Sequence, residues 1–166
     1  MAMCAVDEAV RAHVACGGDP DRMTALDSFC WPDPIAGPCN PAGERKLAQL
    51  VRAARGLADA CLAYRLPLIS GKDAMKNDAV GEGRKISVLP TLLVSLMGIV
   101  PDGEQIVGTD FLHAWHRIWV VGEDRGQRGG SSYARLTGQP FTSVPTAVPE
   151  QRLPLYRGPV SYTHLR

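Results

Sequence analysis

Apolar residues near the start of the chain recur at helical spacing, as Val6, Val10 and Val14. The series stops at Gly17, and glycine commonly stands just beyond a helix end. The pattern predicts a helix over residues 3–16. Residues 23–29 then have the length and apolar character of a short strand, with Asp27 near its end.

The clearest pattern covers residues 44–64. One face carries the apolar side chains of Leu47, Leu50, Val51, Ala54, Leu57, Ala58, Cys61 and Leu62. The other carries Arg45, Lys46, Arg52, Arg55 and Asp59. This predicts a long amphipathic helix packed on a sheet, and its basic residues are interpreted as a solvated face rather than a binding patch. The preceding residues 31–43 contain four prolines, which predict an irregular loop.

Further strands are predicted after this helix. Residues 66–69 form a short buried strand that ends in a glycine turn, and a loop continues through Gly83. Residues 91–100 are apolar enough for a central strand, and residues 117–122 for another buried strand. This order of strands and helices predicts an α/β or α+β domain, with a boundary after the last of these strands.

A second glycine-rich turn follows this boundary. Gly126, Gly129 and Gly130 precede Ser131, which is expected to cap a short helix that begins near Tyr133. Beyond residue 138 the chain is rich in proline and loses its periodicity, so irregular structure is expected there.

Composition narrows the functional classes. The chain has 166 residues, which suits one domain or one domain and part of a second. Its 18 basic and 17 acidic residues are mixed, so no nucleic-acid surface is expected. It has no long apolar run and no signal-peptide pattern, which predicts a soluble cytoplasmic protein without a membrane partner.

The chain has five cysteines and no Cys-x-x-Cys pair, so neither disulfides nor a zinc site is expected. Cys61 is interpreted as a core residue, and Cys30 as either packing or reactive.

The residues with the most chemical information are Gly71, Lys72 and Asp73. Glycine lets a nucleotide's phosphates approach the backbone, lysine supplies a positive charge, and a carboxylate suits Mg²⁺, which prefers oxygen ligands. The same tripeptide also occurs as an ordinary surface turn, and both interpretations stay open on these residues alone.

Four segments together resemble phosphoribosylformylglycinamidine synthase: residues 25–34, 46–53, 67–78 and 90–95. The resemblance extends to about Tyr156. It implies an aminoimidazole ribonucleotide synthetase-like second A domain over residues 1–115 and the start of the following B domain over 116–159. Residues 160–166 do not match the family and are interpreted as a non-native tail. The chain is therefore expected to be a fragment.

The resemblance also implies an activity and its partners. The family uses ATP and Mg²⁺ to activate the amide oxygen of formylglycinamide ribonucleotide, and glutamine-derived ammonia then displaces the phosphate. The implied partners are the remaining half of the synthetase and a glutaminase subunit or domain. Asp73 matches the magnesium-binding position, Gly71 and Lys72 match the nucleotide turn, and Asp27 matches a nucleotide contact. Gly129, Gly130 and Ser131 match a turn that could face an anion.

Other interpretations of these residues stay open. Asp27 could cap a turn, the second glycine pair could serve only packing, and Trp31 is interpreted as a packing residue. No catalytic residue is assigned. Some positions depart from the family pattern, namely Ser28, Ala74, Gln127, Arg128 and Ser132. These changes fit a non-catalytic scaffold that holds a structural nucleotide, and another enzyme of the same ATP-binding superfamily is a third possibility.

Overall fold

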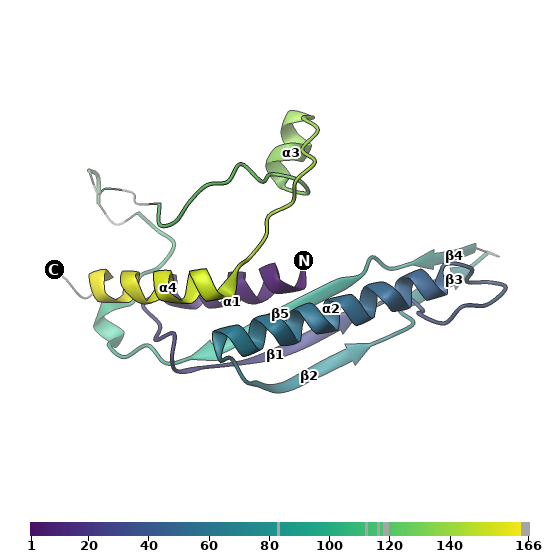
Figure 1. The fold of residues 1–166 in the computed structure, drawn as a ribbon, viewed down its shortest axis with the longest axis horizontal. Helices are drawn as coiled ribbons and strands as arrows, with labels where there is room; N and C mark the ends of the chain where they lie inside the picture. The colour runs from purple at the N-terminus through teal and green to yellow at the C-terminus, as the bar shows by residue number, and fades with distance from the viewer. Residues whose placement is uncertain (83, 112, 116, 118–119, 164–166) are drawn as a thin grey trace.

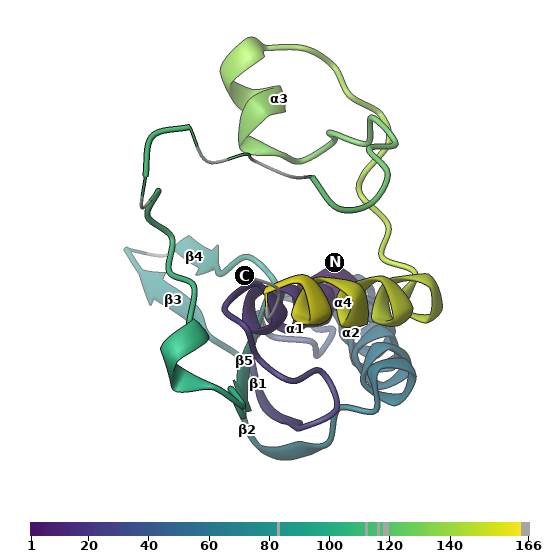
Figure 2. The ribbon, with the colours of Figure 1, turned by 90° about the vertical axis from the view of Figure 1, so that its left-hand side faces the viewer.

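The computed structural model describes residues 1–82, 84–111, 113–115, 117 and 120–163. A three-stranded sheet has two helices on one side, as Figures 1 and 2 show. The helices are α1 (Ala2–Ala15) and α2 (Gly43–Tyr64). The strands are β1 (Met23–Cys30), β2 (Leu68–Ala74) and β5 (Thr91–Gly98). The mixed α/β architecture predicted from the sequence is therefore confirmed.

The sheet has the order β2-β1-β5, with β1 parallel to β2 and antiparallel to β5. The prediction that residues 91–100 form a central strand is wrong, because β1 is central and β5 lies at an edge. The apolar run that suggested a central strand has side chains on both faces of the sheet. Leu93 and Met97 lie on the face without helices, where they are 59% and 64% exposed.

β2 is longer than predicted and starts later. It runs from Leu68 to Ala74, so residues 71–73 belong to the strand rather than to a turn. Pairing with β1 continues to Cys30 beside Ala74, and the Ser28 hydroxyl donates to the Lys72 carbonyl oxygen at 3.3 Å. The ladder to β1 holds this segment extended despite its glycine, because tertiary pairing can override local preference.

The core lies between the sheet and the helices. It contains the three valines of α1 at 6, 10 and 14 and, from α2, Ala53, Leu57, Ala60, Cys61 and Tyr64. The prediction for α2 is correct in its bounds and partly wrong in its buried face, because Leu47, Val51 and Leu62 are exposed. The apolar arc of α2 is wider than the surface that α1 and the sheet cover.

A separate hairpin lies beyond the end of β2, near the labels β3 and β4 in Figure 1. It consists of β3 (Asp78–Gly81) and β4 (Arg84–Ser87), which pair antiparallel. The sequence predicted only a loop through residue 83, which lies outside the described residues. β3 and β4 have only four residues each, too few for a clear strand pattern in the sequence.

The chain after β5 forms an excursion that carries η1 (Gly103–Gln105) and α3 (Ser132–Thr137). It returns as α4 (Pro149–Thr163), which packs on α1 and α2 (Figure 2). The expectation of irregular structure beyond residue 138 is wrong over α4. Leu153 and Tyr156 are buried there, and the Tyr156 hydroxyl donates to Asp7 Oδ1 at 2.7 Å.

The predicted strand over residues 117–122 is not observed where the structure describes the chain. Residues 118 and 119 lie outside the described residues, while 117 and 120–122 belong to no strand. No helix in the described ranges combines the length and the apolar character needed to span a membrane.

Candidate functional site

Asp27 and Asp73 lie on the same face of the sheet. Side chains alternate along a strand, so Asp27 shares a face with buried Ala25 and Phe29 of β1, on the side of the helices. In the parallel pairing Asp27 stands beside Gly71, and Phe29 beside Asp73. We call Asp27 and Asp73 the carboxylate pair. Asp27 lies within β1, so the alternative that it caps a turn is wrong.

Gly71 leaves room for one of these carboxylates. A Cβ atom at this position would lie 2.6 Å from Asp27 Oδ1 and 3.1 Å from the Asp27 carbonyl oxygen. Cβ atoms do not approach other atoms so closely, so a side chain at position 71 would displace the carboxylate. The glycine thus permits a close approach of the Asp27 side chain, and the approach of a nucleotide's phosphates stays a prediction.

The carboxylate pair places negative charge on the helix-facing side of the sheet, with Asp27 partly buried and Asp73 exposed. Partial burial raises the pKa of Asp27, and the negative charge of Asp73 raises it further. The pKa of the Cys61 thiol on α2 is raised by burial and then by the Asp27 carboxylate. Cys61 is buried, which confirms its interpretation as a core residue. A cation or a proton at Asp27 would offset this unfavourable charge.

Lys72 does not join the carboxylate pair. It stands beside Ser28 in the register, so its side chain lies on the opposite face of the sheet from Asp73. The prediction that a single turn presents Gly71, Lys72 and Asp73 together is therefore wrong. The physical reason is the two-residue period of a strand, which separates consecutive side chains.

The second glycine-rich segment lies on the excursion, away from the sheet in both views (Figures 1 and 2). The Gly129 amide donates to the Ser143 carbonyl oxygen at 2.8 Å. The Ser131 hydroxyl accepts from the Ala134 amide at 3.1 Å, which confirms Ser131 as the cap of α3. A hollow of about 270 Å³ opens at this helix start, lined in part by Gly130 and Ser131. The structure does not bring this segment to the carboxylate pair.

Cys30 is the last residue of β1, and Trp31 follows it. Trp31 is 1% exposed, and its Nε1 donates to the Lys46 carbonyl oxygen at 3.0 Å. The interpretation of Trp31 as a packing residue is confirmed. Cys30 is partly buried, and its sulfur accepts from Asn77 Nδ2 at 3.3 Å.

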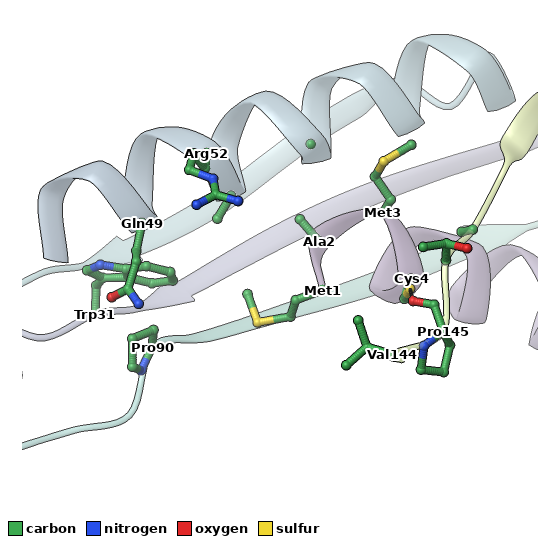
Figure 3. A pocket seen from close by; sticks show the side chains of 14 residues that line it. Met1, Ala2, Met3, Cys4, Trp31, Gln49, Arg52, Pro90, Val144 and Pro145 are labelled. Atoms are coloured by element: carbon green, nitrogen blue, oxygen red, sulfur yellow. Dashed lines mark hydrogen bonds between the residues drawn. The ribbon is translucent and has the colours of Figure 1, made fainter. Parts of the chain in front are cut away.

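A larger hollow of about 480 Å³ lies between the start of α1, α2 and residues 144–147. Figure 3 shows Met1, Trp31 and Pro90 among its apolar lining, with Gln49 and Arg52 extending from α2. None of the seven residues that the sequence predicts for the site lines this hollow. It is separate from the carboxylate pair.

Comparison with known proteins identifies the domain. Residues 1–100 match the family described as AIR synthase related protein, N-terminal domain. The chain belongs to this family. The matched residues contain the sheet, α1, α2 and the carboxylate pair, so the AIR synthase related domain is the part of the chain that holds the candidate site.

Curated relatives carry a more specific name. The chain is 33% identical over 132 residues to "Phosphoribosylformylglycinamidine synthase subunit PurL" of Anaeromyxobacter sp. (strain K), which covers 80% of this chain and 16% of the relative. It is 28% identical over 154 residues to the protein of the same name from Synechococcus elongatus, covering 89% of this chain and 19% of the relative. The chain therefore spans less than a fifth of the length of these relatives.

The AIR synthase related domain also contains a polar network that sequence reasoning missed. Lys85 Nζ lies 2.9 Å from Asp78 Oδ2 and 3.4 Å from Asp33 Oδ2. The available signal was the glycine-containing turn between residues 78 and 87, which is typical of a hairpin. Among the described residues, no group of three or more His, Cys, Asp or Glu side chains could hold a metal. Any Mg²⁺ at the carboxylate pair would need further oxygen ligands from a substrate.

Proposed function

We propose that this chain is part of a phosphoribosylformylglycinamidine synthase, an ATP-dependent ligase of purine biosynthesis. Membership of the AIR synthase related family and the similarity to PurL subunits support this. In this proposal residues 1–115 form the second A domain and residues 116–159 begin the following B domain. Residues 160–166 are proposed to be a non-native tail.

The carboxylate pair is the observation that carries the proposal. Asp27 and Asp73 come from adjacent parallel strands and lie on one face, where burial and then the negative charge of Asp73 raise the pKa of Asp27. Mg²⁺ is a hard cation that usually binds one or two carboxylates together with substrate phosphates. The two carboxylates therefore fit a magnesium ion, and the missing side chain at Gly71 leaves the room that the Asp27 carboxylate occupies. Bound there, Mg²⁺ would offset the charge of the ATP phosphates.

In the proposed reaction the γ-phosphoryl group of ATP is transferred to the amide oxygen of formylglycinamide ribonucleotide. Ammonia then attacks the activated carbon, and inorganic phosphate leaves. Asp27 and Asp73 would hold the cation, while Gly71 keeps the carboxylate of Asp27 in place. The contribution of this chain is positioning and charge neutralisation, which dominate phosphoryl transfer in general. A glutaminase subunit or domain would supply the ammonia.

The open face of the sheet supports a partner in the same proposal. Leu26, Leu93 and Met97 are exposed on the side without helices. Contiguous exposed apolar residues on a sheet commonly mark an interaction surface. We propose that the remaining half of the synthetase covers this face in the complete enzyme.

The position of Lys72 favours a second candidate, in which this site holds a structural nucleotide and takes no part in the reaction. Lys72 lies on the face opposite the carboxylate pair, and Ala74 stands where the family has a serine. A site with the metal ligands but without the adjacent lysine and hydroxyl is suited to holding Mg²⁺ and phosphate without transferring it.

Calorimetric titration of the chain with ATP, with and without Mg²⁺, tests the proposed site. We expect Mg²⁺-dependent binding that Asp73→Ala abolishes. Asp59→Ala is the matched control, because Asp59 is an exposed carboxylate on α2. Equal binding by both variants would remove the carboxylate pair from the nucleotide site. In the completed synthetase, activity that survives Asp73→Ala would favour the structural nucleotide over the catalytic one.

A further inference from the structure

Two segments follow the strands that carry the carboxylate pair, and one lysine bridges them. Asp33 follows β1, and Asp78 opens β3 shortly after β2. Lys85, on β4, forms ion pairs with both carboxylates. We call Asp33, Asp78 and Lys85 the hairpin clamp. It connects the β3–β4 hairpin to the loop of residues 31–43 at the carboxyl ends of the two parallel strands.

The hairpin clamp is well enclosed for a group of charges. The Asp78 side chain is 5% exposed, and those of Asp33 and Lys85 are less than a quarter exposed. Asp78 Oδ2 also accepts from the Asp33 amide at 3.1 Å. Asp78 Oδ1 is buried and has no hydrogen-bond partner, so Lys85 is the main compensation for this carboxylate. Removing a partner from a buried ion pair leaves an uncompensated charge, which is strongly unfavourable.

Hydrogen bonds connect the segments that carry the hairpin clamp to the end of β2. The Trp31 amide donates to the Ala74 carbonyl oxygen at 2.9 Å, and the Asn77 amide donates to the Trp31 carbonyl oxygen at 3.1 Å. Asn77 Nδ2 donates to the Ala74 carbonyl oxygen at 3.0 Å. These bonds extend the contact between the two chain segments past the last strand residues. Asp73 directly precedes the Ala74 anchor.

A second lysine supports the loop side of this connection. Lys46 Nζ, on α2, donates to Asn40 Oδ1 at 2.8 Å and to Ser87 Oγ at 3.0 Å. Asn40 Nδ2 donates in turn to the carbonyl oxygens of Asp33 and Ile35. The loop is therefore tied to α2 independently of Lys85, and the Lys46–Ser87 bond ties the hairpin to α2 as well. Lys85 and Asp78 join the hairpin to this loop.

We propose that Lys85 is a positioning residue, which fixes the end of β2 and so the direction in which Asp73 presents its carboxylate beside Asp27. The inference rests on the proposed function, because it assigns Lys85 to the geometry of the same nucleotide and Mg²⁺ site. Lys85 acts through Asp78 and the Asn77 contacts and does not touch the ligand itself.

Two substitutions at Lys85 and one control test the proposal. Lys85→Met removes the charge and leaves the stem, while Lys85→Arg keeps a cation. Arg157→Met is the control, because it breaks the Arg157–Asp21 ion pair, which is exposed and on α4. Hydrogen exchange of the whole chain reports local order, and calorimetry reports the Kd for ATP with Mg²⁺.

For Lys85→Met we expect faster exchange confined to residues 71–81, with α1 and α2 unchanged. We also expect the Kd to rise about tenfold or more, as for outer residues that orient metal ligands. Lys85→Arg should recover most of both losses, and Arg157→Met should alter neither.

Unchanged exchange in residues 71–81, or equally faster exchange throughout the chain, would overturn the positioning role. So would a normal Kd in a chain whose β2 end has become mobile. A wild-type chain that binds no ATP with Mg²⁺ would overturn the proposed function, and the exchange data would then still decide whether Lys85 fixes the end of β2.

Discussion

Two glycine-containing segments look alike in the sequence and differ in the structure. Gly71, Lys72 and Asp73 lie inside β2, an edge strand whose parallel pairing with β1 holds the backbone extended. Gly129, Gly130 and Ser131 lie on an excursion and open a helix of six residues. The first segment meets a carboxylate from another strand, whereas the second meets backbone groups, among them the Ser143 carbonyl oxygen.

The comparison shows that a glycine beside polar residues has no single meaning. At position 71 the missing side chain makes room for a carboxylate from another strand. At position 130 the backbone has a φ of +74° and no neighbouring atom within 4 Å, so the glycine serves the turn itself. The first segment faces a charged side chain from another strand, whereas the second faces the backbone of residues 141 and 143.

Alanine in place of these glycines should separate the two roles most strongly. Gly71→Ala should lower nucleotide affinity more than tenfold and destabilise the fold by about 1–3 kcal/mol, the usual cost of overpacking. Gly130→Ala should cost about 1–2 kcal/mol through backbone strain at positive φ and leave nucleotide affinity unchanged. Urea unfolding and calorimetry measure both effects. A larger loss of affinity in the Gly130 variant would reverse the comparison.

Removing one charge of the carboxylate pair should weaken Mg²⁺-dependent binding and stabilise the fold. Asp27→Asn should weaken Mg²⁺-dependent binding because a charged oxygen ligand is lost. It should raise the free energy of unfolding at neutral pH because a partly buried charge is removed and the repulsion from Asp73 disappears with it. Unfolding of both proteins at pH 7, with binding measured in parallel, tests this. A less stable Asn variant would contradict the unfavourable charge assigned to Asp27 in the fold.

The same pair predicts a pH dependence. The folded pKa of Asp27 is raised above its ordinary value of 3.8, mainly by burial and then by Asp73. The protonated carboxyl group therefore contributes its full stability below pH 3.8, the ordinary pKa. This contribution is lost as the pH rises through the raised pKa of the folded state. The advantage of Asp27→Asn should accordingly grow between about pH 4 and pH 7. Urea unfolding at each pH measures it, and a gap that narrows as the pH rises would contradict the assignment.

The smallest expected effect belongs to the cap of α3. Ser131→Ala removes the acceptor for the Ala134 amide and should cost about 1 kcal/mol of local helix stability. Nucleotide binding should stay unchanged, because α3, which Ser131 caps, lies away from the sheet that carries the carboxylate pair (Figure 2). Hydrogen exchange at α3 and calorimetry provide the measurements. Weaker binding in this variant would join the two glycine segments in one site.

Periodic elements were predictable from the sequence. The bounds of α1 and α2 follow from helical spacing and from residues that end helices, such as Gly17 with its φ of +94°. The helix α4 was missed because its many prolines mask two buried residues, Leu153 and Tyr156, whose contacts come from α1 and α2. Its stability depends on packing, which local composition does not report.

The candidate site was predictable in part. Asp27, Gly71 and Asp73 were identified as chemically informative, and the structure brings them together. Lys72 was assigned to the same group, but consecutive side chains of a strand lie on opposite faces, so Lys72 lies on the other face of the sheet from Asp73. Asp33, Asp78 and Lys85 were missed because the contact depends on a hairpin that folds back on a distant loop.

The sequence by itself determined the family, the helices with clear periodicity and the residue types available for binding phosphate and Mg²⁺. Only the tertiary structure decided which of those residues meet, which face of the sheet they occupy and which lysine holds the β2 end. The reason is that spacing along a chain fixes local geometry, whereas strand register and hairpin docking depend on contacts between distant segments.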